Sequence, residues 1–413
     1  MKKYEIWLDK IIESSLCLMI FAIPFSKSMV EIFFMSAITF WVLKRISSYK
    51  LHASLINLFK PINTKLNVPI CFFAFIGLFS TLISISPSLS VKGFFLKLLK
   101  SLMLYFITVE IINNGKKLKN ILVAIFVSII LTCADGIYQL ITGMDLMRHY
   151  PLWAGRMQSS FGNPNSFASW LTIMIPLALG LSCFNFSNKY FWLKKYILWL
   201  LICVLIFCLV LTHSKGAWIA VFLSVVFLAI LQKRGRGAII IILGLLILML
   251  VFLPHLSEYI NDYMTHSESN RLTLWIESLA IIKDFPLLGC GLNTYSIVAP
   301  NYKIVEWGGI YPHNSYLQMA AETGLLGLGA FLWIIITIFK TSSANLKKIN
   351  DKFYSALLSG LLAGLFAFLA HSFVDTDLYS LQLRYLMWFV IGLIVAVQKV
   401  ALDEKSKSGE YNV

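Results

Sequence analysis

Basic residues and histidines gather in one set of the polar segments that separate the long apolar runs of this chain. Six of the seven histidines belong to this set: His149, His213, His255, His266, His313 and His371. Its basic residues are Lys27, Lys92, Arg148, Arg156, Lys215, Arg271, Lys283 and Lys303. Imidazoles move protons near neutral pH, and guanidinium and ammonium groups bind anions. The pattern therefore indicates that one face of the protein binds an anion.

His313 is the strongest candidate for a proton acceptor. It follows Tyr311-Pro312 and directly precedes a long apolar helix. An unperturbed imidazole has a pKa of about 6.5, which suits it to remove a proton from a hydroxyl group at neutral pH. A histidine at a helix start also often has a purely structural role, so the residues alone leave both interpretations open.

Arg271, Lys215 and Arg156 are the candidate anion-binding residues. Arg271 begins a predicted helix, where a cation gains nothing from the helix dipole, and its guanidinium suits bidentate contact with phosphate. Lys215 lies on a very short turn beside Gly216, where it either approaches a phosphate closely or anchors the turn at the interface. Arg156 has no acidic neighbour in the sequence.

The segment after Arg271 is predicted to be an amphipathic helix. Leu272, Trp275, Ile276, Leu279 and Ile282 repeat at helical spacing and form one apolar face. We expect this helix to lie along the membrane surface.

His371 and Asp375 are candidates for a supporting role at the outer end of an apolar run. They are four positions apart, so the aspartate could orient the histidine. Asp375-Thr376-Asp377 also matches a short pattern that holds a divalent ion on a diphosphate in many glycosyltransferases. Patterns of three residues occur by chance, and a carboxylate that orients a histidine or forms a helix-end turn is favoured, so no metal site is predicted.

Glu322 and Asn163 are two further supporting candidates. Glu322 lies within an apolar helix that contains Gly324 and Gly327, which predicts close helix packing and a structural role for the carboxylate. Asn163 belongs to Phe161–Ser166, a run of turn formers that favours a turn and a helix cap.

Lys97 and Lys100 are spaced to share one face of an apolar helix. Their ammonium groups either extend outward to the interface or contribute to binding, and the sequence leaves these alternatives open.

These residues must be positioned by a membrane-embedded scaffold. The chain has 413 residues, of which 58% are hydrophobic and 13% charged, whereas about 25% are charged in ordinary soluble domains. The composition predicts an all-α, polytopic integral membrane protein with about 12 transmembrane helices. We place them near 14–25, 29–43, 67–85, 94–112, 120–141, 165–184, 194–212, 216–231, 237–253, 314–339, 354–372 and 381–398.

The net charge of +15 would suggest a nucleic-acid partner in a soluble protein, but the placement of the charges argues against one here. With a cytoplasmic N-terminus, 24 of the 35 lysines and arginines lie in inside segments, as the positive-inside rule expects. We therefore expect both termini in the cytoplasm, and membrane lipids as the partners of most of these cations.

The chain is expected to form a single membrane domain over residues 1–413, in which residues 254–313 form a large periplasmic loop that carries the active site. This loop is the longest polar interruption in the chain, and loops of such length are more often functional than connective. Within it, Gly289 and Gly291 predict tight turns.

The ordered motifs FGNPNSFASWL, LTHSKGAW, NRLTLWIESLAIIKDFPLLGCGLNTY, HNSYLQMAAETGLLG and HSFVD resemble the bacterial O-antigen ligase/polymerase superfamily, and most closely its O-antigen ligases. The resemblance covers roughly residues 155–380. Lys215 stands where the family usually has an arginine, so the charge is kept but the bidentate fork is not.

The resemblance implies a metal-independent, inverting glycosyltransferase that needs no cofactor and acts at the periplasmic face of the bacterial inner membrane. The implied donor is a glycan on undecaprenyl diphosphate, and the implied acceptor is a sugar hydroxyl of the lipid A-core oligosaccharide. His313 would be the general base, and Arg271, Lys215 and Arg156 would bind the diphosphate.

Two alternatives remain. An O-antigen polymerase would use a second lipid-linked repeat as its acceptor. A transporter of lipid-linked glycans is less favoured, because transporters tend to show internal repeats and midplane sites, whereas the candidate residues here gather at one face.

Overall fold

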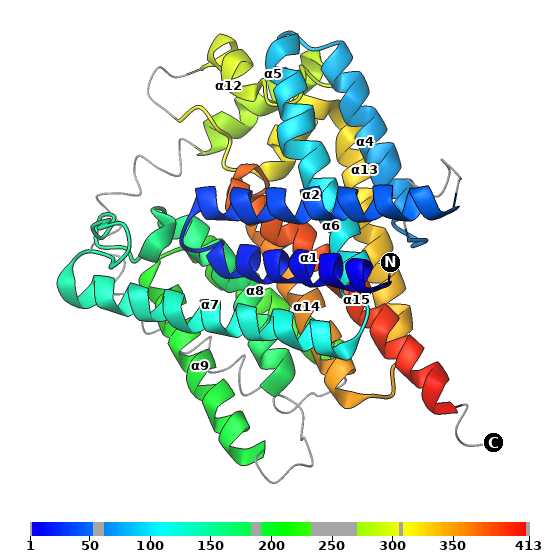
Figure 1. The fold of residues 1–413 in the computed structure, drawn as a ribbon. Helices are drawn as coiled ribbons and strands as arrows, with labels where there is room; N and C mark the ends of the chain where they lie inside the picture. The colour runs from blue at the N-terminus through cyan, green and yellow to red at the C-terminus, as the bar shows by residue number, and fades with distance from the viewer. Residues whose placement is uncertain (1, 53–61, 183–190, 233–270, 305–308, 410–413) are drawn as a thin grey trace.

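The computed structural model describes residues 2–52, 62–182, 191–232, 271–304 and 309–409 (Figure 1). Within these ranges the regular structure is helical, apart from two isolated bridges that join Met144 to Pro151 and Trp153 to Arg156. The prediction of an all-α, polytopic membrane protein is confirmed.

The described residues contain eleven long helices. They are α1 (Lys2–Ala22), α2 (Lys27–His52), α4 (Asn67–Leu82), α6 (Lys100–Ile111), α7 (Gly115–Thr142), α8 (Pro164–Ser182), α9 (Phe191–Leu211), α10 (Lys215–Gln232), α13 (Ser315–Leu346), α14 (Lys352–His371) and α15 (Leu381–Gly409). The short ones are α5 (Pro87–Lys92), the π-helical η1 (Gly93–Leu99), α12 (Tyr295–Val298) and the 3-10 turns η2 (Ser159–Phe161), η3 (Ala299–Tyr302) and η4 (Asp377–Tyr379). Residues 271–284 form a further helix.

Six of the described helices are long and apolar enough to cross a membrane, namely α7, α8, α10, α13, α14 and α15. Asn67–Leu82 and Tyr196–Leu211 are shorter apolar helices. Charged residues such as Asp9, Lys10, Glu31 and Lys44 interrupt the apolar sequence of α1 and α2. Each predicted span coincides with described helical structure except 237–253, which lies outside the described residues, so the total of about twelve crossings stays a prediction.

Helices α1 and α2 form a hairpin around Pro24, and α7 lies alongside α1 (Figure 1). The amides of Phe25 and Ser26 both donate to the carbonyl of Ala22 at 3.0 Å and close the turn. Lys100 on α6 forms an ion pair with Glu31 on α2 at 2.8 Å. Lys100 thus has a carboxylate partner, and its environment differs from that of Lys97.

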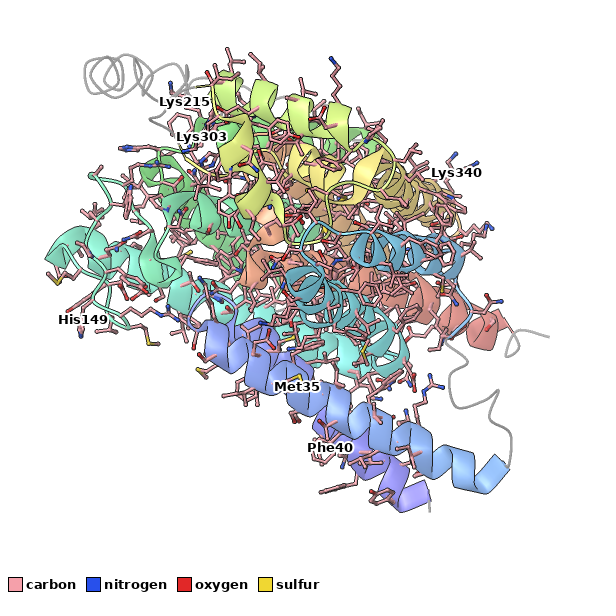
Figure 2. All side chains as sticks on the ribbon, turned by 90° about the horizontal axis from the view of Figure 1, so that it is seen from above. Met35, Phe40, His149, Lys215, Lys303 and Lys340 are labelled. Atoms are coloured by element: carbon pink, nitrogen blue, oxygen red, sulfur yellow. The ribbon has the colours of Figure 1, made fainter. Side chains whose placement is uncertain are left out.

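Large apolar side chains remain exposed around the bundle. Examples are Ile32, Met35, Ile141 and Ile230, and Met35 projects outward from α2 (Figure 2). A soluble protein rarely exposes so much contiguous apolar surface. These side chains therefore provide the surface that faces the lipid tails.

Helix α8 lies at the centre of the bundle and packs against α14. A Cβ atom added at Gly180 would lie only 2.6 Å from the Cα atom of Gly360, so the two backbones touch where both residues lack a side chain. Close approach at small residues is the usual way for membrane helices to pack without a hydrophobic driving force. This contact joins the two helices that carry Ser169 and His371 of the site.

Helix α13 is interrupted at Gly324, where the backbone is non-helical with φ 69° and ψ 179°. Residues 286–293 fill the break: the amides of Cys290 and Gly291 donate to the carbonyls of Ala321 and Glu322 at 2.9 and 3.0 Å, and the amide of Leu325 donates to Pro286 at 2.8 Å. Non-helical backbone is tolerated at membrane depth only when such partners satisfy its polar groups.

The break corrects the expected role of Gly324, which does not serve ordinary helix packing. A Cβ atom at Gly324 would lie 2.0 Å from the carbonyl oxygen of Leu287, and its φ of 69° suits glycine. Gly289 and Gly291 also have positive φ values, of 73° and 118°. The predicted tight turns are therefore present, and they allow the loop to enter the helix break.

The described part of the outer segment has a small core of its own. Ile281, Cys290, Tyr295, Val298 and Ala299 are buried together against Ala321 of α13. Of the proposed 254–313 loop, residues 254–270 and 305–308 lie outside the described residues. The assignment of this segment to the periplasm and the single-domain boundaries stay predictions.

Candidate functional site

His313 occupies an unusual backbone position directly before α13. Its φ is +46°, a left-handed conformation that is uncommon for a residue with a side chain. The next residue, Asn314, caps α13 by accepting hydrogen bonds from the amides of Tyr316 and Leu317 at 3.0 and 3.1 Å. Asn314, and not His313, therefore caps α13. The His313 imidazole remains available for other contacts.

Asp375 holds one side of the His313 ring. Nδ1 of His313 lies 3.3 Å from Oδ1 of Asp375, and the His313 side chain is 42% exposed. Ser315 fixes the loop that carries Asp375: its amide donates to the carbonyls of Ser372 and Asp375, and its hydroxyl donates to the carbonyl of Asp375 at 3.0 Å. The start of α13 and the 372–378 loop are therefore locked together.

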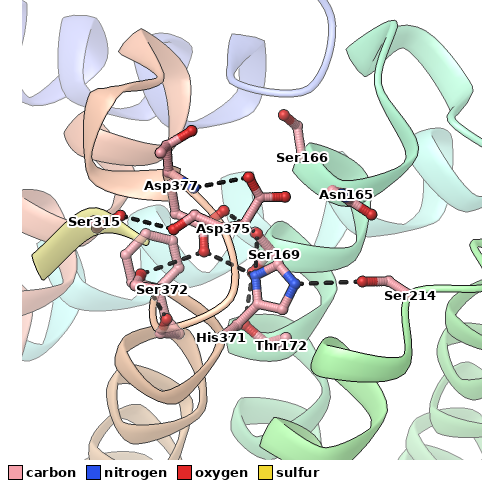
Figure 3. A network of polar contacts seen from close by, with 12 residues as sticks. Asn165, Ser166, Ser169, Thr172, Ser214, Ser315, His371, Ser372, Asp375 and Asp377 are labelled. Atoms are coloured by element: carbon pink, nitrogen blue, oxygen red, sulfur yellow. Dashed lines mark hydrogen bonds and ion pairs between the residues drawn. The ribbon is translucent and has the colours of Figure 1, made fainter. Parts of the chain in front are cut away.

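His371 lies in a separate, fully buried network at the end of α14 (Figure 3). Its Nδ1 lies 2.8 Å from both Oδ2 of Asp377 and Oγ of Ser169, and its Nε2 lies 3.3 Å from Oγ of Ser214. The hydroxyl of Ser169 also donates to Asp377. The expectation that Asp375 orients His371 is therefore wrong. Asp377 contacts His371, whereas Asp375 contacts His313.

The two carboxylates differ in electrostatic environment. Burial raises the pKa of Asp375, but the hydrogen bond with His313 and the charge of His371 outweigh it and hold that pKa at about 2. Burial raises the pKa of Asp377 above its usual value, and the contacts with His371 oppose this only in part. Asp375 is therefore ionised at neutral pH, and its negative charge faces His313.

Arg156 connects two outer turns. Its Nε donates to the carbonyl of Thr212 at 2.8 Å, and its Nη2 donates to Oδ1 of Asn165 at 2.6 Å. Asn163 caps α8, as predicted, by accepting from the amides of Asn165 and Ser166. Burial and the charge of Arg156 lower the pKa of His213. Arg156 is thus a fixed cation at the junction of the turns before α8 and α10.

Lys215 begins α10 directly after the turn that Arg156 holds. The neighbouring Gly216 packs on the 371–377 loop so closely that an added Cβ atom would lie 2.4 Å from Val374 and 3.5 Å from His371. Lys215 lies on the same side of the molecule as Lys303 of the outer segment (Figure 2). The structure therefore brings Arg156, Lys215 and His371 to one region, and the diphosphate-binding role of the two cations stays a prediction.

Arg271 starts the predicted helix, whose apolar residues Leu272, Ile276 and Leu279 are indeed exposed. One turn further, the indole of Trp275 donates to the carbonyl of Pro312 at 2.9 Å, directly before His313. Residues four apart lie on the same helix face, so Arg271 is on the side that contacts the 311–313 segment. Its charge also acts on His371.

A polar cavity of about 450 Å³ opens beside His313. His313, Asp375, Asp377, Glu322 and Asn163 contribute to its wall, together with Lys27, Lys97, Ser166, Asn293, Gln318 and Gln382. Arg271, Lys215, Arg156 and His371 are not among its lining residues. The predicted site residues therefore fall into separate groups. One group is in the cavity wall. Arg156, Lys215 and His371 lie around the turn before α10, and Arg271 begins the helix that contacts Pro312.

Glu322 closes the inner side of this cavity, next to the break in α13. Its Oε2 accepts from the amide of Asn293 at 2.8 Å, and its Oε1 accepts from Nε2 of Gln318 at 3.3 Å. The side chain of Asn293 in turn accepts a hydrogen bond from Lys97. Glu322 thus has the structural contacts that were expected, but it also faces the cavity.

A smaller apolar cavity of about 70 Å³ adjoins the polar one. The two share Lys97, Asn293, Glu322 and Tyr379. Phe73, Leu98, Leu292, Met319, Phe331 and Trp388 form much of its remaining wall. The polar and the apolar cavity thus share part of one wall.

Residues 196–332 match the sequence model of the family described as O-Antigen ligase. An O-antigen ligase of Salmonella typhimurium (strain LT2) is 27% identical over 185 residues, which cover 40% of this chain and 45% of that protein. A ComP-specific O-oligosaccharyltransferase of Acinetobacter baylyi is 28% identical over 199 residues, which cover 45% of this chain and 34% of that protein. Over these residues the chain is similar to the O-antigen ligase superfamily.

These matches confirm the resemblance that the motifs indicated, and they make a glycosyl-transfer enzyme the expected class. The chain spans less than half the length of either curated relative that it matches. The part that matches the O-antigen ligase family includes Lys215, Arg271, His313 and Glu322, but it ends before Asp375 and Asp377.

Several residues at this O-antigen ligase-like site gave little signal in the sequence. Ser169 lies within an apolar run, where a serine usually bonds to its own helix backbone. Gln318 and Asn293 are single polar residues without a motif. Lys27 was visible only as one more outward-facing cation. Only long-range packing brings these side chains to the cavity.

Proposed function

We propose that this protein transfers a glycan from undecaprenyl diphosphate to a sugar hydroxyl of the lipid A-core oligosaccharide, as an O-antigen ligase. The reaction takes place at the periplasmic face of the inner membrane, with both termini in the cytoplasm. The observation that supports this most directly is the His313–Asp375 pair at 3.3 Å in the wall of a polar cavity. Similarity to the O-antigen ligase family supports the reaction class.

His313 is the general base in this proposal. With Asp375 ionised, the Nδ1 atom of His313 keeps its proton and donates to the carboxylate, so Nε2 is left as the acceptor. Nε2 removes the proton of the acceptor hydroxyl as its oxygen attacks the anomeric carbon. The bond from that carbon to the phosphate oxygen breaks, and undecaprenyl diphosphate leaves with the electron pair. Attack opposite the leaving group inverts the anomeric configuration.

Three cations outside the cavity wall stabilise the departing diphosphate. Arg271, Lys215 and Arg156 are the residues assigned to this role, and fixed positive charges act most strongly where negative charge develops. Two features support the assignment: Trp275 ties the Arg271 helix to Pro312, and Arg156 is anchored to Thr212. These groups neutralise the phosphates with side chains alone, so the mechanism uses no metal ion and no cofactor.

His371, Asp377 and Ser169 hold the 371–377 loop in place. Because His371 is buried and fully engaged by its neighbours, it acts through Asp377 and the loop and not on the substrate. Asn163 and Glu322 form cavity wall. Membrane lipids surround the bundle, and no nucleic-acid partner is proposed.

The decisive experiment is a transfer assay with the purified protein in detergent, given a lipid-linked glycan and the lipid A-core acceptor. Transfer without a membrane supports an enzyme and excludes a role limited to transport. An absence of product with active, folded protein would contradict the proposal.

An O-antigen polymerase is the second candidate, and a deletion strain separates the two. If the protein is a ligase, the strain loses all capped lipopolysaccharide and accumulates long lipid-linked polymer. If it is a polymerase, the strain shows lipopolysaccharide with a single repeat.

A further inference from the structure

The polar cavity beside His313 is distinct from the cation group that is assigned to the diphosphate. His313 belongs to its wall, whereas Arg271, Lys215 and Arg156 do not. A general base contacts the acceptor, and the leaving group departs from the opposite side of the anomeric carbon. The cavity is therefore placed for the acceptor side of the reaction, an inference that rests on the proposed function.

The lining offers hydrogen bonds in the manner of a saccharide site. Gln318 is buried, and its Oε1 atom accepts no hydrogen bond from the described residues, although its Nε2 donates to Glu322. A buried acceptor without a donor is costly unless a ligand or water supplies one. A sugar hydroxyl is a fitting donor, and Asn163, Ser166 and Gln382 add neutral partners in the same wall.

Lys27 adds a positive charge to this wall. It is exposed, it begins α2, and no carboxylate of the described residues lies within ion-pair distance of it. A cation in the first turn of a helix is opposed by the helix dipole. The carboxylates of the wall do not compensate it, because Asp375 and Asp377 contact histidines, and Glu322 is bound by Asn293 and Gln318.

We propose that this cavity binds the acceptor saccharide and that Lys27 recognises an anionic substituent on it, such as a phosphate or a carboxylate. Gln318 and the neutral side chains bind hydroxyl groups, and His313 receives the proton of the hydroxyl that reacts. The volume of about 450 Å³ lies within the range of roughly 300–1,000 Å³ that is usual for small-ligand sites. Lys27 is thus a specificity residue for the acceptor.

The test is steady-state kinetics of purified Lys27→Gln with the donor and the acceptor varied separately. Because the lysine is exposed, we expect its loss to raise the KM for the acceptor about threefold to tenfold, with kcat and the KM for the donor unchanged. The matched control is Lys92→Gln, which removes another exposed lysine that does not line the cavity. It should leave every constant at the wild-type value.

A second arm repeats the comparison with an acceptor whose anionic groups have been removed, by phosphatase for phosphates or by carboxyl reduction for uronates. The difference between Lys27→Gln and wild type should then vanish. A rise in the KM for the donor, an unchanged KM for the acceptor, or an effect that persists with the neutral acceptor would each overturn the proposal. Transfer by the wild-type protein in the same assay tests the proposed function independently.

Discussion

The imidazole of His313 and the carboxylate of Asp375 meet at 3.3 Å although they are 62 positions apart in the chain. Ser315 creates this contact, because its amide and hydroxyl bind the backbone of the 372–375 turn. The pair that we propose for proton transfer is therefore assembled by two helix ends, the start of α13 and the end of α14.

Replacing His313 with alanine should lower turnover by at least about 10²-fold, because the acceptor hydroxyl loses its base. The protein should still fold, since Asn314 and not His313 caps α13. The measurement is glycan transfer by purified His313→Ala, with its melting temperature in detergent as the control for folding. Turnover near the wild-type rate would refute the base assignment.

Asp375→Asn should reduce turnover by roughly 10- to 100-fold with little loss of stability, because an amide no longer favours the proton on Nδ1 of His313. The pKa of Asp375 of about 2 means that this carboxylate stays charged throughout the working pH range. Protonation of Asp375 should therefore not contribute to the loss of wild-type activity at any pH above about 3. Rates measured from pH 4 to 8 check this, and an unchanged rate in Asp375→Asn would show that the pair is not needed.

Arg271→Ala should lower turnover by about 10- to 100-fold, with a smaller effect on donor affinity, because the polyprenyl chain also holds the donor in the bilayer. Arg271→Lys should restore activity only in part, since the bidentate fork is lost. Lys283→Ala is the matched control, because Lys283 is an exposed cation on the same helix. Equal activities of Arg271→Ala and Lys283→Ala would argue against a role for Arg271 in the diphosphate site.

Transfer should continue in excess EDTA, because fixed cations neutralise the diphosphate in the proposed mechanism. The assay compares rates before and after chelation, and after re-addition of Mg²⁺ or Mn²⁺. If chelation stopped turnover and a metal restored it, Asp375 and Asp377 would have to be reconsidered as metal ligands.

Gly324→Ala should destabilise the protein by several kcal/mol, because the added Cβ atom would lie 2.0 Å from the carbonyl oxygen of Leu287 at a φ of 69°. Gly329→Ala on the same helix is the control, since nothing lies within 4 Å of a Cβ atom there. The control should be neutral or stabilising by up to about 1 kcal/mol. Thermal unfolding in detergent measures both, and equal melting temperatures would contradict the description of the break.

The sequence predicted most of the helices, because apolar runs of membrane length are a strong local signal. It also identified His313, Arg271, Lys215 and Arg156 as candidates, since charged groups are conspicuous in such a chain. It did not predict that α13 is broken at Gly324, because the partners of the break lie in residues 286–293, about 35 positions earlier.

The pairing of histidines with aspartates was also beyond the sequence. His371 has two aspartates close to it in the chain, and spacing favoured Asp375, whereas the fold directs Asp377 to it. The choice depends on Ser169 and Ser315, which lie on other helices. Local spacing identifies the groups, but tertiary contacts decide which of them meet.

The interrupted helix has a consequence for protein engineering. Residues 286–293 supply hydrogen-bond donors for the α13 break, and Ser80 of α4 donates to the carbonyl of Glu322 at 2.8 Å. Ser84 packs directly against Gly291. The 286–293 loop and the α13 break thus satisfy each other's backbone hydrogen bonds. A chimera that exchanges acceptor or donor preference between related enzymes should therefore transplant the loop, the α13 break and the outer end of α4 as one cassette.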